Sequence, residues 1–223
     1  MDKFSWPEPP SQTAFPVARA GYPIIFFAAF ATAIFALLEW PVLAMTGLGL
    51  TIFITLFFRD PDRIVPDREG AIVSPADGKV VFIGRVDKTP FDDEAVLKIS
   101  IFMSVFNAHV NRIPCGGIVR KIQYHPGKFF AASLDKASDR NERNAFLLET
   151  QNGRKIGVVQ VAGLIARRII CGLRENDVVT SGQRFGMICF GSRVDLYLPI
   201  DMETNVIAGD NVKAGTSLLG HLK

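Results

Sequence analysis

The chain is poor in cysteine and histidine, with three of each among its 223 residues. Cys115, Cys171 and Cys189 are far apart and form no Cys-x-x-Cys pair, so the sequence indicates neither a disulfide framework nor a zinc site. Such a pattern is typical of a reducing compartment. Gly-x-Gly-x-x-Gly, Walker and His-Glu-x-x-His motifs are also absent, which argues against a nucleotide cofactor or a catalytic metal.

A marked excess of either charge is lacking as well. The 25 basic and 22 acidic side chains leave a formal charge of +3, and no basic stripe runs along the chain. This balance predicts no nucleic-acid partner. Hydrophobic residues make up 48% of the chain, which excludes a disordered protein, and the length fits one medium domain with an appendage.

The hydrophobic residues are concentrated between Tyr22 and Phe58, where Glu39 is the single formal charge. Two uncharged runs, 22–38 and 41–58, are separated by a Glu-Trp-Pro sequence that predicts a turn. As helices they would be about 26 Å long, close to the roughly 30 Å of a hydrocarbon core. We expect residues 21–58 to form a helical hairpin associated with a membrane, either spanning it or lying in one leaflet. The alternative is a hairpin buried in a soluble protein.

Arginines flank the hairpin on both sides, at Arg19 before it and at Arg59, Arg63 and Arg68 after it. By the positive-inside tendency, both ends lie on the cytoplasmic side, which predicts the cell (inner) membrane as the location. The three later arginines either attract anionic headgroups or belong to a solvated linker. Residues 1–20 are Pro-rich and expected to be irregular, and residues 59–70 are expected to be a linker.

Strand patterns dominate residues 71–223. The β-branched and aromatic runs bounded by turn residues are 71–73, 79–86, 95–105, 117–124, 145–150, 155–162, 187–198 and 205–208. Near the end, Gly-Asp-x-Val-x-x-Gly (209–215) resembles the hairpin turns of biotinyl and lipoyl carrier domains. The sequence therefore predicts a mainly-β catalytic domain, a flattened β barrel or sandwich related to those hairpins, preceded by the helical membrane hairpin.

Three places have residues suited to catalysis. Asp77 lies in Ser-Pro-Ala-Asp-Gly (74–78), where a turn-forming role is the alternative. His109 ends an apolar strand region (102–114), where a purely structural histidine is the alternative. Gly191 and Ser192 lie between apolar flanks, and residues 187–198 are interpreted as one continuous strand passage.

A glycine carbonyl next to a serine hydroxyl is suited to an intramolecular acyl shift. Gly191 permits unusual backbone geometry and leaves its carbonyl unshielded. Ser192 would need a base to remove its proton, and that base would need an orienting carboxylate. His109 and Asp77 are the candidates for these two roles.

Four segments together resemble the short form of phosphatidylserine decarboxylase, a pyruvoyl-dependent membrane enzyme that makes phosphatidylethanolamine. They are SPADGKV (74–80), FMSVFNAHVNRIP (102–114), YHPGKFFAASLDKASDRNER (124–143) and FGSRVDLYLP (190–199). The resemblance implies a proenzyme that cuts itself between Gly191 and Ser192 into a β chain (1–191) and an α chain (192–223). It also implies a processing triad of Ser192, His109 and Asp77.

The same resemblance implies the cofactor and the partners. Ser192 would become a covalent pyruvoyl group, which would form a Schiff base with phosphatidylserine from the membrane before carbon dioxide leaves. The α and β chains would stay together as a heterodimer, and family analogy implies a homodimer of such pairs. Longer relatives have a second histidine three residues after the first, where this chain has Arg112. It stays open whether His109 alone serves both processing and turnover or Arg112 helps.

Two other functions fit parts of the sequence. A membrane-anchored serine peptidase would also use serine, histidine and aspartate. A non-enzymatic biotinyl- or lipoyl-like carrier domain would present a lysine at a hairpin tip, but Lys79 and Lys213 lack the flanks of such lysines.

Overall fold

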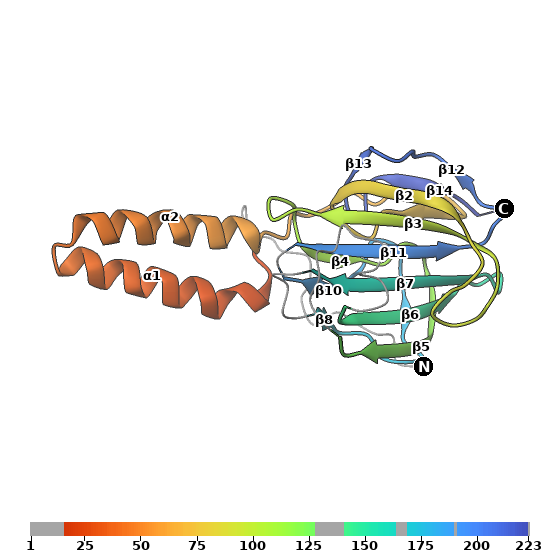
Figure 1. Cartoon of the computed structure of the whole chain (residues 1–223), viewed down its shortest axis with the longest axis horizontal. Helices are drawn as coiled ribbons and strands as arrows, with labels where there is room; N and C mark the ends of the chain where they lie inside the picture. The colour runs from red at the N-terminus through yellow and green to blue at the C-terminus, as the bar shows by residue number, and fades with distance from the viewer. Residues whose placement is uncertain (1–15, 128–140, 164–168, 190, 223) are drawn as a thin grey trace. The chain divides into compact units, whose positions relative to one another are not determined.

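The structure is a computed structural model that describes residues 16–127, 141–163, 169–189 and 191–222 (Figure 1). The chain divides into two compact units. The helical unit ends at Asp62 and the β unit begins at Arg63.

The helical unit contains the two helices that the hydrophobic runs predict. A short 3-10 helix, η1 (Arg19–Gly21), leads into α1 (Tyr22–Leu37), and α2 (Pro41–Phe57) follows. Each α-helix ends one residue before the corresponding run. Both have proline in the first turn, where its missing N–H costs no helical hydrogen bond. Glu39 reverses the chain between them with a φ of 59°.

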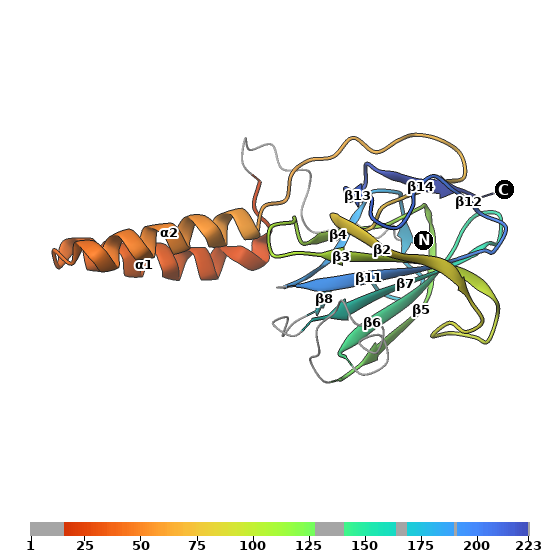
Figure 2. The ribbon, with the colours of Figure 1, turned by 45° about the horizontal axis from the view of Figure 1, so that its top comes forward.

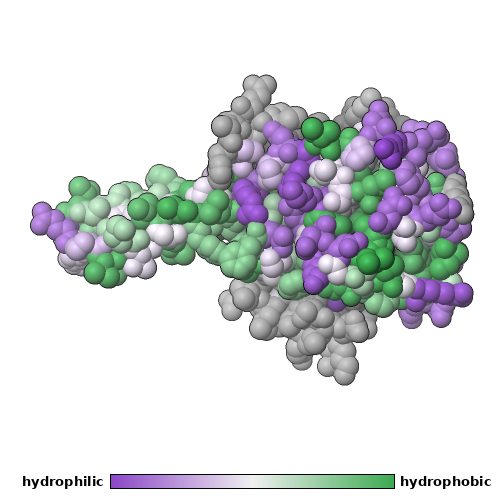
Figure 3. Space-filling view, turned by 90° about the horizontal axis from the view of Figure 1, so that it is seen from above, coloured by the Kyte–Doolittle hydropathy of each residue, from purple (hydrophilic) through white to green (hydrophobic). Residues whose placement is uncertain are grey.

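Helices α1 and α2 contain no charged residue and are mostly apolar on their surface. No residue of α1 is buried, and Phe26, Phe27 and Leu37 are 64%, 68% and 84% exposed. Hydrophobic side chains predominate on the face of the helices that is seen in Figure 3. Water disfavours a helix that is apolar all round, whereas a lipid environment suits it. Among the described residues, Arg19–Leu37 is long and apolar enough to cross a membrane, and Pro41–Phe57 is a shorter apolar helix. The N-terminal unit therefore contains a candidate membrane segment.

The two helices pack closely where small residues meet. The hydroxyl oxygens of Thr32 and Thr51 lie 3.3 Å apart across the helix pair. A Cβ on Gly47 would lie 2.6 Å from Oγ1 of Thr32, so glycine is needed at this contact. Small residues that allow close backbone approach are the usual interface of helices in membranes.

The β unit is mainly antiparallel sheet, as predicted. Its described strands are β1 (Ala71–Val73), β2 (Gly78–Val86), β3 (Val96–Met103), β4 (Val110–Arg112), β5 (Gly117–His125), β6 (Arg143–Glu149), β7 (Lys155–Ala162), β8 (Ile169–Cys171), β9 (Val178–Val179), β10 (Arg184–Ile188), β11 (Ser192–Leu198), β12 (Glu203–Thr204), β13 (Asn211–Val212) and β14 (Leu218–His221). Eight of them form one curled sheet in the order β13-β2-β3-β11-β7-β6-β5-β9 (Figure 2). Two three-stranded sheets, β1-β14-β12 and β4-β10-β8, accompany it.

The main core lies between the large sheet and the smaller ones. Alternation along β11 directs Val194, Leu196 and Leu198 into this core, and we call this the inner face of the large sheet. Phe146 of β6 and Phe185 of β10 meet edge to face with ring centroids 4.9 Å apart. This contact joins the large sheet to the β4-β10-β8 sheet, so the β unit is a two-layered structure over one core.

Two strand predictions are wrong. Residues 187–198 are not one strand, because β10 ends at Ile188 and β11 begins at Ser192 in a different sheet. The chain changes sheets there, and Gly191 takes a positive φ of 57°. Residues 205–208 are not a strand either; pairing with β14 involves Glu203 and Thr204. The short strands β4, β8, β9, β13 and β14 were not predicted, because two to four residues carry no clear alternation.

Candidate active site

Ser192 opens the strand in the middle of the large sheet. Strand β11 lies between β3 and β7, with Ser192 paired to Met103 on one side and Ala162 on the other (Figure 1). Alternation along the strand places Ser192 on the inner face. The residue is fully buried, and its Oγ has no hydrogen-bond partner among the described residues. Leaving a buried hydroxyl unpaired costs about 1–3 kcal/mol, so this position needs a reason other than stability.

The backbone conformation of Gly191, the residue before Ser192, favours glycine. Its φ of 57° lies in the left-handed region, where a side chain costs about 1–2 kcal/mol. A Cβ built there would meet no described atom within 4 Å. Among the described residues, packing therefore does not require glycine at this position.

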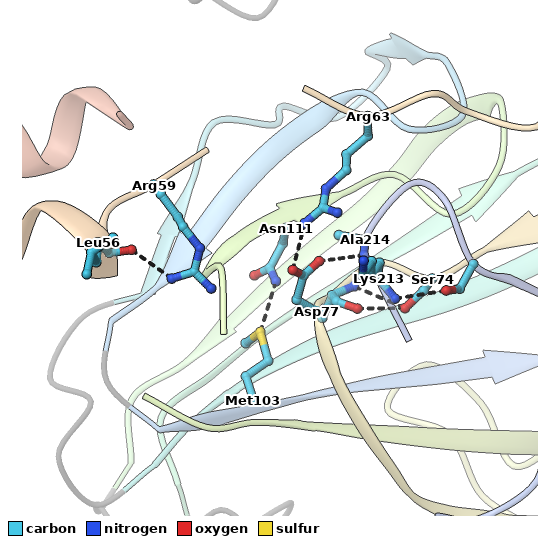
Figure 4. A network of polar contacts seen from close by, with 11 residues as sticks. Leu56, Arg59, Arg63, Ser74, Asp77, Met103, Asn111, Lys213 and Ala214 are labelled. Atoms are coloured by element: carbon cyan, nitrogen blue, oxygen red, sulfur yellow. Dashed lines mark hydrogen bonds and ion pairs between the residues drawn. The ribbon is translucent and has the colours of Figure 1, made fainter. Parts of the chain in front are cut away.

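Asp77 lies in the turn between β1 and β2 and is 7% exposed. Its Oδ1 accepts a hydrogen bond from the backbone N–H of Ala214, and its Oδ2 accepts one from Nη2 of Arg63, both at 2.7 Å (Figure 4). The carboxylate thus joins three distant parts of the sequence. A turn-forming role alone does not account for these two long-range contacts.

The strand register brings Asp77 and Ser192 to the same end of the large sheet. Lys79 pairs with Phe102, and Met103 pairs with Ser192. The turn before β2 therefore lies two strands away from Ser192. Neighbouring strands are about 4.8 Å apart, so the two backbones are separated by roughly 10 Å.

His109 directly precedes β4, a strand of the sheet that covers the core, and is fully buried. Two residues later, Nδ2 of Asn111 donates to Sδ of Met103 at 3.6 Å. Met103 is the sheet neighbour of Ser192, so His109 belongs to a segment that packs over this end of the inner face.

The three predicted residues share one region but form no closed hydrogen-bond chain in the described part of the structure. Within the described ranges, the Asp77 carboxylate contacts Arg63 and Ala214, and Oγ of Ser192 has no hydrogen-bond partner. The structure thus gathers the candidates without the Ser–His–Asp hydrogen bonds that the triad would use.

Arg112, the residue in the position of the second family histidine, is also buried. Its Nη1 donates to the carbonyl of Gly182 at 3.1 Å, and its backbone N–H donates to the carbonyl of Pro75 at 2.9 Å. The second bond ties β4 to the turn that holds Asp77. These contacts position the segments on which His109 and Asp77 lie.

A buried relay of amide side chains crosses the same region and was not predicted. Nδ2 of Asn144 donates to Oε1 of Gln160 at 3.2 Å, and Nε2 of Gln160 donates to Oδ1 of Asn111 at 2.9 Å. All three residues are at most 4% exposed. The one visible signal was a glutamine inside the apolar run 155–162; the partners are far apart in sequence. The relay fixes β4 against β6 and β7.

A second unpredicted group is a buried ion cluster on the outer face of the large sheet, opposite Ser192. Nε of Arg193 lies 2.8 Å from Oδ1 of Asp195, and its Nη2 lies 3.1 Å from Oδ2. Nζ of Lys98 lies 3.2 Å from the same Oδ2. Arg193 and Asp195 are only 2% and 1% exposed. Alternating charged residues in an apolar strand usually indicate a solvated face, so the burial could not be predicted.

The described cysteines near the core are poor nucleophiles. Burial raises the pKa of the Cys115 thiol to about 12, and burial is also the main cause that raises the pKa of Cys171. Both thiols stay protonated at neutral pH, because desolvation disfavours the thiolate. Of the nucleophilic groups considered, Ser192 is therefore the one whose position requires a functional explanation.

The fold and the site together define a mainly-β protein with an N-terminal apolar helical hairpin and a buried serine at an internal Gly–Ser bond. A family model described as phosphatidylserine decarboxylase matches residues 50–220. The chain belongs to the phosphatidylserine decarboxylase family, as its motifs predicted. Residues 128–140 and Phe190, which are part of those motifs, lie outside the described residues.

Curated relatives match almost the whole chain. A protein of Desulfotalea psychrophila is 52% identical over 211 residues, which cover 95% of this chain and 99% of the relative. Proteins of Geotalea uraniireducens and Syntrophotalea carbinolica are each 50% identical, over 93% of this chain and 97% of each relative. All three are named phosphatidylserine decarboxylase proenzyme.

Proposed function

We propose that this chain is the precursor of a pyruvoyl-dependent phosphatidylserine decarboxylase that cuts itself between Gly191 and Ser192. Its relatives are named proenzymes, which implies processing. The observation that carries the cleavage site is the buried Oγ of Ser192, which has no hydrogen-bond partner in the part of the chain that the structure describes, beside a glycine in the left-handed region. This arrangement fits a serine that becomes the reactive group.

Processing would begin when His109 takes the Ser192 hydroxyl proton. Oγ then attacks the Gly191 carbonyl carbon, the C–N bond breaks, and the amide becomes an ester with a free Ser192 amine. Loss of the Ser192 α-hydrogen breaks the Cβ–Oγ bond and releases the Gly191 carboxylate, leaving a dehydroalanine end. Addition of water and loss of ammonia leave the pyruvoyl group. Neither an oxidant nor a reductant is required.

Asp77 would orient His109 during this step. Arg63 and Ala214 each donate a hydrogen bond to one oxygen of the Asp77 carboxylate. An ionised carboxylate has about four acceptor positions, so Asp77 can also accept a hydrogen bond from His109. Arg112 is engaged with Gly182, which favours His109 alone as the group that moves protons in both processing and turnover.

The pyruvoyl group would supply the electron sink for loss of carbon dioxide from the bound substrate. The residues of this chain would bind the substrate, exclude water and donate a proton. Val194 and Leu196 continue the inner face beyond residue 192 and keep that end of the site apolar. His109 would protonate the carbon from which carbon dioxide has left.

Phosphatidylserine is the proposed substrate, and it stays in the bilayer because of its acyl chains. The apolar hairpin 21–58 would hold the enzyme at the cytoplasmic face of the inner membrane, where the substrate is. After cleavage the α chain would remain bound to the β chain, since β11 pairs with β3 and β7 on its two sides. A homodimer of these pairs is the proposed assembly.

Self-cleavage is tested with Ser192→Ala and a matched control, Ser100→Ala. Ser100 is a buried serine on the neighbouring strand β3. Purified wild-type protein and Ser100→Ala should both yield a C-terminal fragment of 32 residues (192–223) with the mass of a pyruvoyl end. Ser192→Ala should remain uncut and lose decarboxylase activity entirely.

Denaturing gels and intact-mass measurement decide the outcome. Active wild-type protein that consists of a single unbroken chain would refute the proposal. A serine peptidase would instead retain an unmodified Ser192 that reacts with a fluorophosphonate, and a carrier domain would show neither reaction.

A further inference from the structure

Arg193 follows Ser192 directly and is the residue through which a pyruvoyl group would be attached to the α chain. Its side chain points to the outer face of the large sheet, where it forms a two-point ion pair with Asp195. The Arg193 side chain is 3% exposed and that of Asp195 is 1% exposed. The processing scheme gives no role to this buried pair.

We infer that Arg193, held by Asp195 and Lys98, is a positioning residue that anchors the pyruvoyl end after cleavage. This inference rests on the proposed function and concerns the mature enzyme only. We call the cluster of Arg193, Asp195 and Lys98 the end anchor.

Cleavage changes how residue 192 is held. In the precursor, peptide bonds to Gly191 and Arg193 hold it on both sides. Once the first bond is broken, the bond to Arg193 is its one covalent attachment. Chain ends are poorly ordered unless other contacts tie them down.

Conversion of Ser192 also removes a hydrogen-bond donor from the sheet. The amide nitrogen leaves as ammonia and a ketone oxygen takes its place, so residue 192 has no backbone N–H to share with β3 or β7. Backbone hydrogen bonds therefore hold residue 192 less firmly than they hold the other residues of β11. Side-chain contacts of the next residue must compensate.

The end anchor is well placed for this task. Residues 192 and 193 point to opposite faces of the sheet, so the ion cluster restrains the strand without occupying the inner face, where substrate would bind. The guanidinium holds the carboxylate at two points, through a hydrogen bond from Nη2 to Oδ2 and an ion-pair contact between Nε and Oδ1, which restricts orientation as well as distance. Lys98 binds the same carboxylate from β3 and lies 5.5 Å from the centroid of the Tyr197 ring, which ties the anchor to the neighbouring strand.

The test compares Arg193→Lys with Arg154→Lys in the full chain. Lysine keeps the charge at position 193 but loses the two-point geometry, which limits the damage to folding. Arg154 forms an equally short two-point pair with Asp201, at 3.2 and 2.6 Å, but is half-exposed and lies before β7 at the far end from residue 192. Arg154→Lys therefore makes the same arginine-to-lysine change in an ion pair that does not contact the end of the α chain.

We expect Arg193→Lys to be cut into the same two fragments as wild type. Its kcat should fall by about ten- to a hundredfold with little change in KM, since a displacement near 1 Å can cost a hundredfold in rate. Its ketone should react faster than that of wild type with a soluble arylhydrazine, measured by the mass of fragment 192–223. Arg154→Lys should match wild type in all these measurements.

Other results would contradict either the inference or the proposed function. Cleaved Arg193→Lys with wild-type kcat and wild-type ketone reactivity would overturn the inference, as would a folded variant that fails to cut. Wild-type protein without a cut or a ketone would refute the proposed function itself. If Arg193→Lys does not fold, Lys98→Gln decides: it keeps the arginine–aspartate pair, and ketone reactivity equal to wild type would contradict the anchor.

Discussion

Arg63 shows how one side chain can take a role that its sequence neighbourhood conceals. Its position after an apolar hairpin predicted a headgroup contact or a solvated linker residue. The structure instead pairs its guanidinium with Asp77 at 2.7 Å, with the two side chains only 15% and 11% exposed. A charge-assisted hydrogen bond of this kind contributes about 1.5–3 kcal/mol. Arg63 therefore holds the carboxylate that is proposed to orient His109.

Removing this ion pair should slow self-cleavage. Arg63→Gln is expected to reduce the rate of fragment release about tenfold, because Asp77 loses the partner that fixes its Oδ2. Arg63→Lys should recover part of the rate, since it keeps the charge but not the planar fork. The rate is measured on denaturing gels after synthesis of the precursor in a cell-free system.

Arg68→Gln is the control, because Arg68 is an exposed arginine of the same linker. Equal rates for Arg63→Gln, Arg68→Gln and wild type would show that the contact to Asp77 does not matter for processing.

At the scale of elements, the important feature is the break between β10 and β11. The chain leaves the β4-β10-β8 sheet after Ile188 and enters the large sheet at Ser192. Gly191 makes this change of sheet with a positive φ, which places the proposed scissile bond where the ladder of β11 begins. The proposed scissile bond lies at the very start of β11, so its cleavage leaves the pairings of residues 193–198 with the neighbouring strands in place.

Gly191→Ala should destabilise the precursor by about 1–2 kcal/mol and slow its cleavage, because alanine strains the left-handed backbone and shields the carbonyl. Gly153→Ala is a matched control: its φ is 73°, and a Cβ there also meets no described atom within 4 Å. It should cost similar stability and leave cleavage unchanged. Thermal unfolding and fragment yield are compared for both variants, and equal cleavage would remove the role assigned to Gly191.

At the scale of the whole molecule, the chain combines two units with opposite solvent requirements. The β unit buries its apolar residues in a shared core, whereas α1 and α2 expose most of theirs. A lipid substrate provides a reason for this combination, since the enzyme must work where the acyl chains are. Under the proposed function, the hairpin would serve attachment and the β unit would serve chemistry.

Phe30→Asp should weaken membrane attachment, because a carboxylate in the middle of a membrane helix costs about 2.5–3.5 kcal/mol. Phe30 is 56% exposed on α1. Ile64→Asp adds the same charge at a residue that is 89% exposed in the β unit and should have no such effect. Carbonate extraction of membranes measures the bound fraction. Equal retention of both variants would show that α1 is not the attachment segment.

Much of the molecule follows from local pattern. Uncharged runs long enough for two helices predicted α1 and α2 to within one residue at their ends. Regular alternation predicted most of β2, β3 and β7, and the Gly–Ser pair between apolar flanks identified the candidate nucleophile. These features depend on residues that are neighbours in the sequence, so periodicity and turn chemistry are sufficient.

What the tertiary structure decided depends on residues that are distant in the sequence. The pairing of Arg63 with Asp77, the Asn144–Gln160–Asn111 relay and the burial of Arg193 with Asp195 required the strand order and register. The break at Gly191 likewise depended on which sheet each flank joined. The sequence alone determined the two helices, the longer strands, the family and the candidate residues. Which of these side chains meet, and which charges are buried, was decided by packing between strands that no local pattern specifies.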